Sequence, residues 1–158
     1  MYLKFLCYNN GMEKALEQNL NWLIIRASLP AKQVFVALGE NYGLTHMQLF
    51  TLCLINLDGS TVMHEISKGL RCDASNVTGL VDRLLALGFV ERSEHPTDRR
   101  IKVIELTAKG REVRGSIMRK LADTAVPGLQ SGLSAAEQGT LTALLTKTLQ
   151  ACDAPFRD

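Results

Sequence analysis

The segment from Asp73 to Gly88 has an apolar pattern that only one face of an α-helix can satisfy. Its apolar residues recur at intervals of three and four positions: Val77, Leu80, Val81, Leu84 and Leu85. Asp73 is a good N-cap, and Gly88 is the residue type that commonly ends a helix. The segment is therefore predicted to be a helix whose apolar stripe packs against a core.

The opposite face of this helix begins with small and polar residues, where long charged side chains would ordinarily cover a solvent face: Ser75, Asn76, Thr78 and Gly79. A shorter helix is predicted before it, from about Val62 to Leu70, with a tight link at residues 71–73. Such a pair describes a helix-turn-helix, whose second helix places its first turns in the major groove of DNA. Ser, Thr and Asn can hydrogen-bond base edges there, and Gly permits close approach. An ordinary amphipathic helix pair fits this segment equally well.

The residues after Gly88 predict a β-hairpin. Phe89 to Ser93 and Ile101 to Leu106 have the composition of strands, and His95 to Arg100 forms the turn between them. Thr107 is then the predicted N-cap of another helix. Helix, helix, recognition helix and hairpin in this order make a winged helix, in which the hairpin is the wing.

Arg99 and Arg100 stand side by side in the turn of this wing. A guanidinium is more weakly hydrated than an ammonium, so it enters a narrow A·T-rich minor groove at lower cost. We expect Asp98 to form an ion pair with Arg100 and so to aim it. The alternative is a solvated hairpin tip whose surface ion pair contributes less than about 1 kcal/mol.

Charge is unevenly distributed along the 158 residues, although the net charge is only +2. Residues 91–120 contain nine Lys and Arg residues against five Asp and Glu residues, a local charge of +4, so the remainder carries −2. A basic segment on a nearly neutral protein favours binding to a phosphate backbone, although such segments are often only solvated faces. Within it, Lys102 is expected to contact phosphate whatever the DNA sequence.

Three motifs in this region resemble the MarR family of bacterial transcription regulators. They are the D-x-R of the wing, the L-T-x-x-G that follows it, and the VTGLVDRL stretch of the upstream helix. The resemblance implies a mainly α fold with a small β-hairpin: a winged helix-turn-helix at residues 41–106, flanked by dimerisation helices at residues 1–40 and 107–158. It implies double-stranded DNA as the partner. It also implies that Arg100 reaches the minor groove, with Asp98 as its brace and Arg99 as a second candidate.

The resemblance assigns base reading to the front of the recognition helix, which here is Ser75, Asn76, Thr78 and Gly79. Family members often have a larger polar or basic residue where Gly79 stands, so readout is expected to rest more on Asn76 and Thr78. Asp82 and Arg83 match a D-R pair of the family and are expected to be mainly structural, with Arg83 near a phosphate.

Two helices are predicted before the helix-turn-helix. The first spans Met12 to Leu38, and Pro30 is expected to break or kink it near Ser28. The second has Thr45 as its N-cap and continues to about Leu57. Its apolar residues at helical intervals are Met47, Phe50, Leu54 and Leu57.

A capping box of the form S-x-x-E, Ser134 to Glu137, starts the last predicted helix. An apolar stripe follows it: Leu141, Leu144, Leu145, Thr148 and Leu149. Such a stripe needs a partner, and the family resemblance implies dimerisation through the terminal helices, so a homodimer is expected. The alternative is that the stripe packs only on its own chain.

Family members respond to small, often aromatic, molecules or to oxidation of a cysteine. The residues expected to bind an aromatic effector lie on the first two helices: Trp22, Ile25, Arg26, Met47 and Phe50. The alternative is that they are core residues, which we favour for Met47 and Phe50. A redox role for Cys7 is not expected. The peroxide-sensing branch of the family keeps its reactive cysteine inside the first long helix, whereas Cys7 precedes that helix.

Several other classes of protein are disfavoured. Four widely spaced cysteines (Cys7, Cys53, Cys72 and Cys152) and three histidines (His46, His64 and His95) show no metal-ligand spacing, and Cys53 and Cys72 are expected to be small buried hydrophobes. No nucleophile, base and orienting group occur together, so neither an enzyme nor a cofactor is expected. No apolar run is long enough to span a membrane, which favours a cytoplasmic protein.

The alternative function is a winged-helix protein-interaction module without specific DNA readout.

Overall fold

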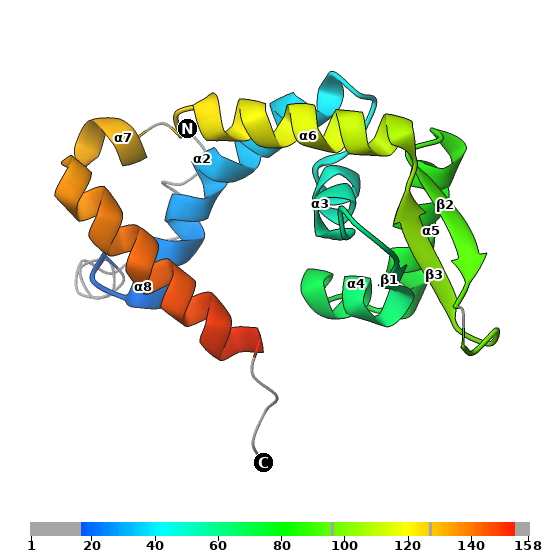
Figure 1. The fold of residues 1–158 in the computed structure, drawn as a ribbon. Coiled ribbons are helices and arrows are strands. Elements are labelled where there is room, and N and C mark those ends of the chain that lie inside the picture. Colours follow the sequence, from blue (N-terminus) through cyan, green and yellow to red (C-terminus); the bar gives the residue numbers. More distant parts are fainter. Residues whose placement is uncertain (1–16, 96, 127, 154–158) are drawn as a thin grey trace, which may run out of the picture. The chain divides into compact units, whose positions relative to one another are not determined.

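The computed structural model describes residues 17–95, 97–126 and 128–153. The chain divides into two units after Thr124. The first contains α2 (Leu20–Glu40), α3 (His46–Leu54), β1 (Thr61–Val62), α4 (Met63–Leu70), α5 (Ala74–Ala86), β2 (Val90–Glu94), β3 (Lys102–Leu106) and α6 (Ala108–Asp123) (Figure 1). The second contains α7 (Leu129–Gly132) and α8 (Ala135–Asp153).

The core of the first unit lies where α3, α4 and α5 meet the base of the sheet. The predicted stripe of α5 is confirmed, because Val77, Val81 and Leu84 are fully buried. The other fully buried apolar side chains are Leu49, Leu52, Ile55, Ile66, Val103, Ile104, Leu106 and Ile117. Burial of one face of α5 leaves its opposite face, predicted to read DNA, exposed to solvent.

The sheet has three antiparallel strands in the order β1-β3-β2. β2 and β3 are the predicted hairpin, with Val90 opposite Leu106 and Glu94 opposite Lys102. β1 was not predicted, because two residues are too few to leave a pattern in the sequence. It pairs Thr61 with Ile104, and so attaches the segment before α4 to the base of the wing.

The L-T-x-x-G motif joins the hairpin to α6. The Thr107 side chain accepts a hydrogen bond from the Gly110 backbone N–H (3.0 Å) and donates one to the Gly88 carbonyl (2.7 Å). The Thr107 backbone N–H donates to the Phe89 carbonyl (3.1 Å). A Cβ atom at position 110 would collide with that same Phe89 carbonyl. The motif therefore joins the two ends of the hairpin to the first turn of α6, and its glycine is required by the close approach of the backbone.

Basic side chains of α6 connect this helix to the ends of other elements. Arg114 donates two hydrogen bonds to the Cys53 carbonyl in the last turn of α3 (3.3 and 3.1 Å). Arg111 donates to the Leu57 carbonyl (3.1 Å), and Lys109 donates to the Leu87 carbonyl at the end of α5 (2.9 Å). The last carbonyls of a helix lack partners within the helix, so these cations satisfy groups that would otherwise need water.

The first long helix differs from its prediction. The part expected from Met12 to Leu16 lies outside the described residues. Of the two alternatives expected near Ser28, the break does not occur, since α2 continues without interruption from Leu20 to Glu40 with Pro30 inside it, whereas a kink stays a prediction. Proline removes one hydrogen bond from a helix, but the residues after it can keep the helix in place by packing. Here Phe35 packs against the core and Leu38 is buried within it.

The end and the inward face of α3 also differ. The predicted N-cap at Thr45 is confirmed, and it forms a capping box with Gln48. The helix ends at Leu54 and not near Leu57, because the backbone of Ile55 is extended. The buried face of α3 is not the one that carries Met47, Phe50, Leu54 and Leu57. Leu57 is 48% exposed and Phe50 41% exposed. Periodicity did not distinguish this stripe from the adjacent one, which provides the core residues Leu49 and Leu52.

The second unit begins its long helix with the predicted capping box. The Ser134 backbone N–H and hydroxyl both donate to one carboxylate oxygen of Glu137 (2.8 and 2.6 Å). These hydrogen bonds lower the pKa of the Glu137 carboxyl. Beyond the cap, Leu144, Leu145 and Leu149 of the predicted stripe are exposed within this single chain, with Leu149 at 65%, whereas Leu141 is partly buried.

We predict that Gly110→Ala destabilises the protein. The added methyl group would meet the Phe89 carbonyl, and overpacking of this kind typically costs about 1 to 3 kcal/mol. Chemical denaturation would measure the loss. Gly115→Ala is the matched control on the same helix, because its Cβ would meet nothing within 4 Å. The control should raise stability by about 0.5 to 1 kcal/mol, as expected for Gly→Ala inside a helix. Equal effects of the two substitutions would contradict the proposed close approach.

Candidate nucleic-acid interface

The first turns of α5 present the residues that were predicted to read bases. Ser75, Asn76, Thr78 and Gly79 are all exposed. Thr78 donates its hydroxyl to the Ala74 carbonyl one turn earlier (3.0 Å), which leaves its oxygen lone pairs and its methyl group for a partner. In the described part of the chain, the side chains of Ser75 and Asn76 have no hydrogen-bond partner. A Cβ at Gly79 would meet open space, so a second surface can approach this turn closely.

The link between α4 and α5 sets the direction in which α5 points. Arg71 adopts the left-handed conformation (φ 51°), which is uncommon for a residue with a side chain. The Cys72 backbone N–H bonds back to the Ser67 carbonyl (3.2 Å), which ends α4. Asp73 occupies the N-cap position of α5, but its side chain makes no capping hydrogen bond. The turn geometry therefore starts this helix without the side-chain cap that the sequence suggested.

Asp98 shapes the wing differently from the prediction. Its carboxylate accepts a hydrogen bond from the Arg100 backbone N–H (3.0 Å), and no ion pair joins it to the Arg100 guanidinium. The Ile101 backbone N–H donates to the Asp98 carbonyl (3.0 Å), which tightens the same turn. The expected ion pair is wrong because an aspartate two residues before an N–H matches the geometry of an Asx turn. Asp98 thus fixes the backbone of Arg100 and leaves its side chain free to extend.

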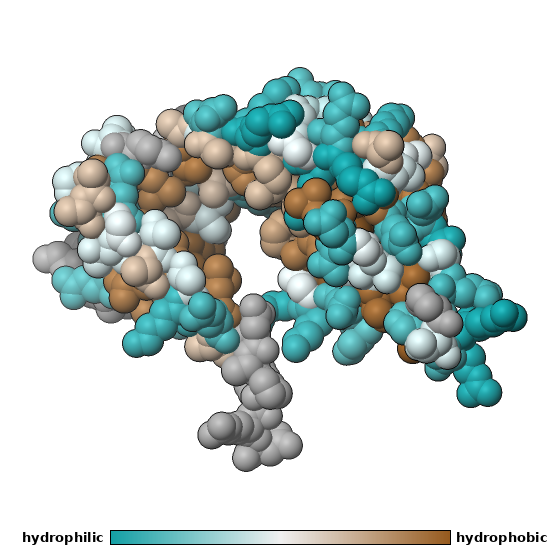
Figure 2. Space-filling view, viewed as in Figure 1, coloured by the Kyte–Doolittle hydropathy of each residue, from teal (hydrophilic) through white to brown (hydrophobic). Residues whose placement is uncertain are grey.

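The remaining charges of the wing are unequally partnered. Lys102 lies 2.9 Å from one carboxylate oxygen of Glu94, and Arg99 lies 3.9 Å from the other. Arg100 is exposed, and its guanidinium has no hydrogen bond or ion pair with any residue that the structure describes. Hydrophilic residues cover the tip of this hairpin, which extends beyond the helices (Figures 1 and 2). Arg100 is therefore the wing cation that is available to a phosphate or a groove.

Most of the basic segment 91–120 is used within the protein itself. Seven of its nine cations have an intrachain partner: Arg92, Arg99, Lys102, Lys109, Arg111, Arg114 and Lys120. The Arg92 guanidinium, for example, lies 3.0 Å from the Asp82 carboxylate and connects β2 to α5. This pair gives Asp82 the structural role that was expected of it, whereas Arg83 is exposed. The charge of the segment is thus not a continuous surface for DNA.

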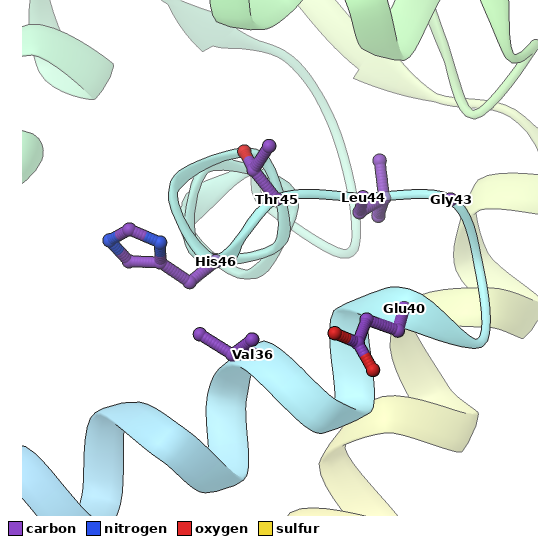
Figure 3. A pocket seen from close by; sticks show the side chains of 6 residues that line it. All are labelled: Val36, Glu40, Gly43, Leu44, Thr45 and His46. Atoms are coloured by element: carbon purple, nitrogen blue, oxygen red, sulfur yellow. The ribbon is translucent and has the colours of Figure 1, made fainter.

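A pocket of about 540 Å³ lies where the end of α2 meets the start of α3 (Figure 3). It is lined by Val36, Glu40, Gly43, Leu44, Thr45 and His46. None of the five predicted effector residues lines it. Sequence reasoning missed this site because it is formed by a loop between two helices, and neither helix shows a pattern that marks it.

The predicted effector residues are spread along two helices. Trp22 and Met47 are partly buried, whereas Ile25, Arg26 and Phe50 are exposed. A core role for Phe50, which the sequence favoured, is wrong at 41% exposure, and its ring packs edge-on against Phe35 with 6.0 Å between centroids. These side chains offer apolar and cationic surface, but they are not gathered into the pocket at the start of α3.

Cysteine and metal chemistry have little support in the described residues. Burial raises the pKa of the Cys53 thiol, and the nearby Arg114 opposes this only in part, which disfavours the reactive thiolate. Cys53 and Cys72 are half-buried against the core rather than fully buried, and Cys7 lies outside the described residues. Within residues 17–95, 97–126 and 128–153, no three His, Cys, Asp or Glu side chains are grouped as metal ligands. None of the helices there is both long and apolar enough to cross a membrane.

The fold and the two exposed surfaces define a winged helix-turn-helix protein, and comparison with known proteins identifies its family. The MarR family model matches residues 44–102. The multiple antibiotic resistance protein MarR of Salmonella typhimurium is 32% identical over 106 residues, which are 67% of this chain and 74% of that protein. The chain belongs to the MarR family of transcriptional regulators.

Solved structures agree with this assignment. The apo form of Escherichia coli MarR is 27% identical and superposes with a TM-score of 0.69 over 83% of this chain and 97% of that one. A cysteine-to-serine variant of the same protein, solved in complex with operator DNA, is 28% identical, with a TM-score of 0.68 over 82% of this chain and 93% of that one. The mainly α fold with a small sheet is therefore confirmed as a MarR winged helix.

Proposed function

We propose that this chain is a dimeric, sequence-specific DNA-binding repressor that a small molecule releases from a pseudo-palindromic site. The observation that carries the proposal is that Asn76 on α5 and Arg100 on the wing are exposed and that their side chains have no partner among the described residues. The operator complex of the Escherichia coli relative supports the same use of the fold here.

In this proposal, α5 enters the major groove. The free amide of Asn76 can bond an adenine edge in two places, and Ser75 can donate to or accept from either kind of base. Thr78 offers an acceptor and a methyl group, since its proton is engaged by its own helix. Gly79 permits close approach, and Arg83 lies further along the helix, where it would meet the phosphate backbone. Phosphate contacts position the protein, whereas the base contacts specify the sequence.

The wing carries the second half of the recognition. Arg100 enters the minor groove, where a guanidinium responds to the narrow width and strong negative potential of A·T-rich DNA. Asp98 holds its backbone in place through the hydrogen bond to the Arg100 N–H. Arg99 and Lys102 contact phosphate on either side of the groove once they leave Glu94.

A homodimer accounts for apolar surface that one chain leaves exposed. Leu20 on α2 is 69% exposed and Leu149 on α8 is 65% exposed, together with Leu23, Ile24, Leu29 and Leu144. Large apolar side chains left exposed on a helix usually mark an interface, and two-fold dimers are the commonest assembly. Two recognition helices about 34 to 36 Å apart would then meet successive major grooves of a pseudo-palindromic site.

We predict that Arg100→Ala weakens binding to DNA flanking the protein's own gene by about 1 to 3 kcal/mol. Fluorescence anisotropy at physiological salt would measure the change. Arg119→Ala is the matched control, because Arg119 is an exposed cation on α6 with no partner in the described ranges. The control should leave affinity nearly unchanged. Unchanged affinity for Arg100→Ala would exclude the wing assignment, and a wild type that binds no DNA would favour the protein-interaction module.

We predict that Asn76→Ala relaxes discrimination at individual base pairs and leaves affinity for random DNA almost unaltered. Base contacts carry about 1 to 3 kcal/mol of discrimination, whereas phosphate contacts are indifferent to sequence. Lys102→Ala is the comparison, and it should weaken all sequences alike. Binding to a panel of single-base variants of the site would measure both effects. Equal losses for Asn76→Ala on specific and random DNA would show that this residue does not read bases.

We predict that aromatic carboxylates such as salicylate, and not peroxide, release the protein from DNA. The proposed site is lined by Trp22, Ile25, Met47 and Phe50, with Arg26 as the cation for the carboxylate. A ligand must prefer the non-binding state by about 5.5 kcal/mol to reverse a 99:1 population. Titration of the DNA complex with salicylate and peroxide would test this. Release by peroxide that disappears in Cys7→Ser would replace the ligand mechanism by a redox one.

A further inference from the structure

Glu94 is the acidic residue that faces the cations of the wing. It is the last residue of β2 and stands directly opposite Lys102, the first residue of β3. One oxygen of its carboxylate lies 2.9 Å from the Lys102 ammonium, and the other lies 3.9 Å from Nε of Arg99. The hairpin register therefore places a single carboxylate between two of the three cations at the tip of the wing, which are Arg99, Arg100 and Lys102.

The acidic residue in the turn of the wing is already engaged. Asp98 accepts its hydrogen bond from the Arg100 backbone N–H, so it forms part of the turn. Glu94 is thus the carboxylate that neutralises side-chain charge here. Among the residues described, this leaves Arg100 as the cation of the hairpin tip without a partner.

We propose that Glu94 limits the affinity of the wing for DNA, because its carboxylate competes with DNA phosphates of any sequence for Lys102 and, more loosely, for Arg99. The proposal rests on the DNA-binding function proposed above. A phosphate must compete with Glu94 for Lys102, and the carboxylate itself repels the DNA backbone. Random DNA is held almost entirely by phosphate contacts, whereas a specific site also gains base and groove contacts. Glu94 therefore weakens random and specific binding by similar factors, and random DNA isolates the effect because it lacks the base contacts.

A purely structural role for the Glu94 pair would have a different signature. Exposed ion pairs contribute little to stability, and the Glu94 carboxylate is 53% exposed in this pair. In Glu94→Gln the amide oxygen can still accept a hydrogen bond from Lys102, so the hairpin is retained while the charge is lost. DNA binding should change and thermal stability should not.

The test is the salt dependence of binding to a random-sequence duplex long enough for two half-sites. Glu94→Gln should raise affinity for this duplex several-fold and steepen the slope of log K against log salt by up to about one per wing, because Lys102 then contacts a phosphate without competition from Glu94. Affinity for DNA flanking the protein's own gene should rise by a similar factor. Glu91→Gln is the matched control: Glu91 is exposed on the same strand and has no side-chain partner in the described residues. It should leave the slope unchanged.

Equal effects of Glu94→Gln and Glu91→Gln would overturn the inference, because net charge alone would then explain them. The absence of an effect in both variants would overturn it as well. If the wild-type protein fails to bind the duplex at every salt concentration tested, the proposed function itself is overturned. If Glu94→Gln fails to fold, Glu94→Ser replaces it. A double-mutant cycle gives a second readout, since Lys102→Met should weaken random binding more in the Glu94→Gln background than in the wild type. Additive effects would show that Glu94 does not restrain Lys102.

Discussion

The backbone contact between Gly110 and the Phe89 carbonyl determines how the wing and the helices of the first unit fit together. Thr107 completes this junction by bonding to both Gly88 and Gly110. Because one carbonyl lies against the first turn of α6, the hairpin that begins at Val90 has a fixed origin. The two DNA-facing surfaces, the front of α5 and the tip of the wing, are both attached to this junction, so their separation depends on it.

Cations in this protein serve two distinct purposes. Those on α6 donate to carbonyls near the ends of α3 and α5, and so stabilise the arrangement of the helices. Those on the wing are placed where DNA would lie, and their availability depends on Glu94 and Asp98. Counting basic residues along the chain could not separate these purposes, because both kinds carry the same charge. Fewer of these cations remain without a partner among the described residues than the local charge suggests.

The exposed apolar residues of α2 and α8 are the surface that the proposed homodimer would cover. The winged helix buries its own core, whereas these helices keep large side chains such as Leu20 and Leu149 in solvent. A protein that must place two recognition helices at a fixed separation gains from such surface, because dimerisation sets the distance between them. The proposed effector residues lie on α2 and α3, so a ligand there could change that separation.

Local sequence determined the elements whose signals are short in range. The apolar stripe of α5, the caps at Thr45, Thr107 and Ser134, and the hairpin followed from spacing and turn chemistry. Tertiary structure decided what depends on neighbours distant in the sequence. It made α2 continuous through Pro30, buried Leu49 and Leu52 in place of Phe50, and added the two-residue strand β1. It also paired Lys102 with Glu94 across the hairpin and bonded Asp98 to the backbone. These outcomes depend on which groups come within contact distance, and that distance is set only when the chain has folded.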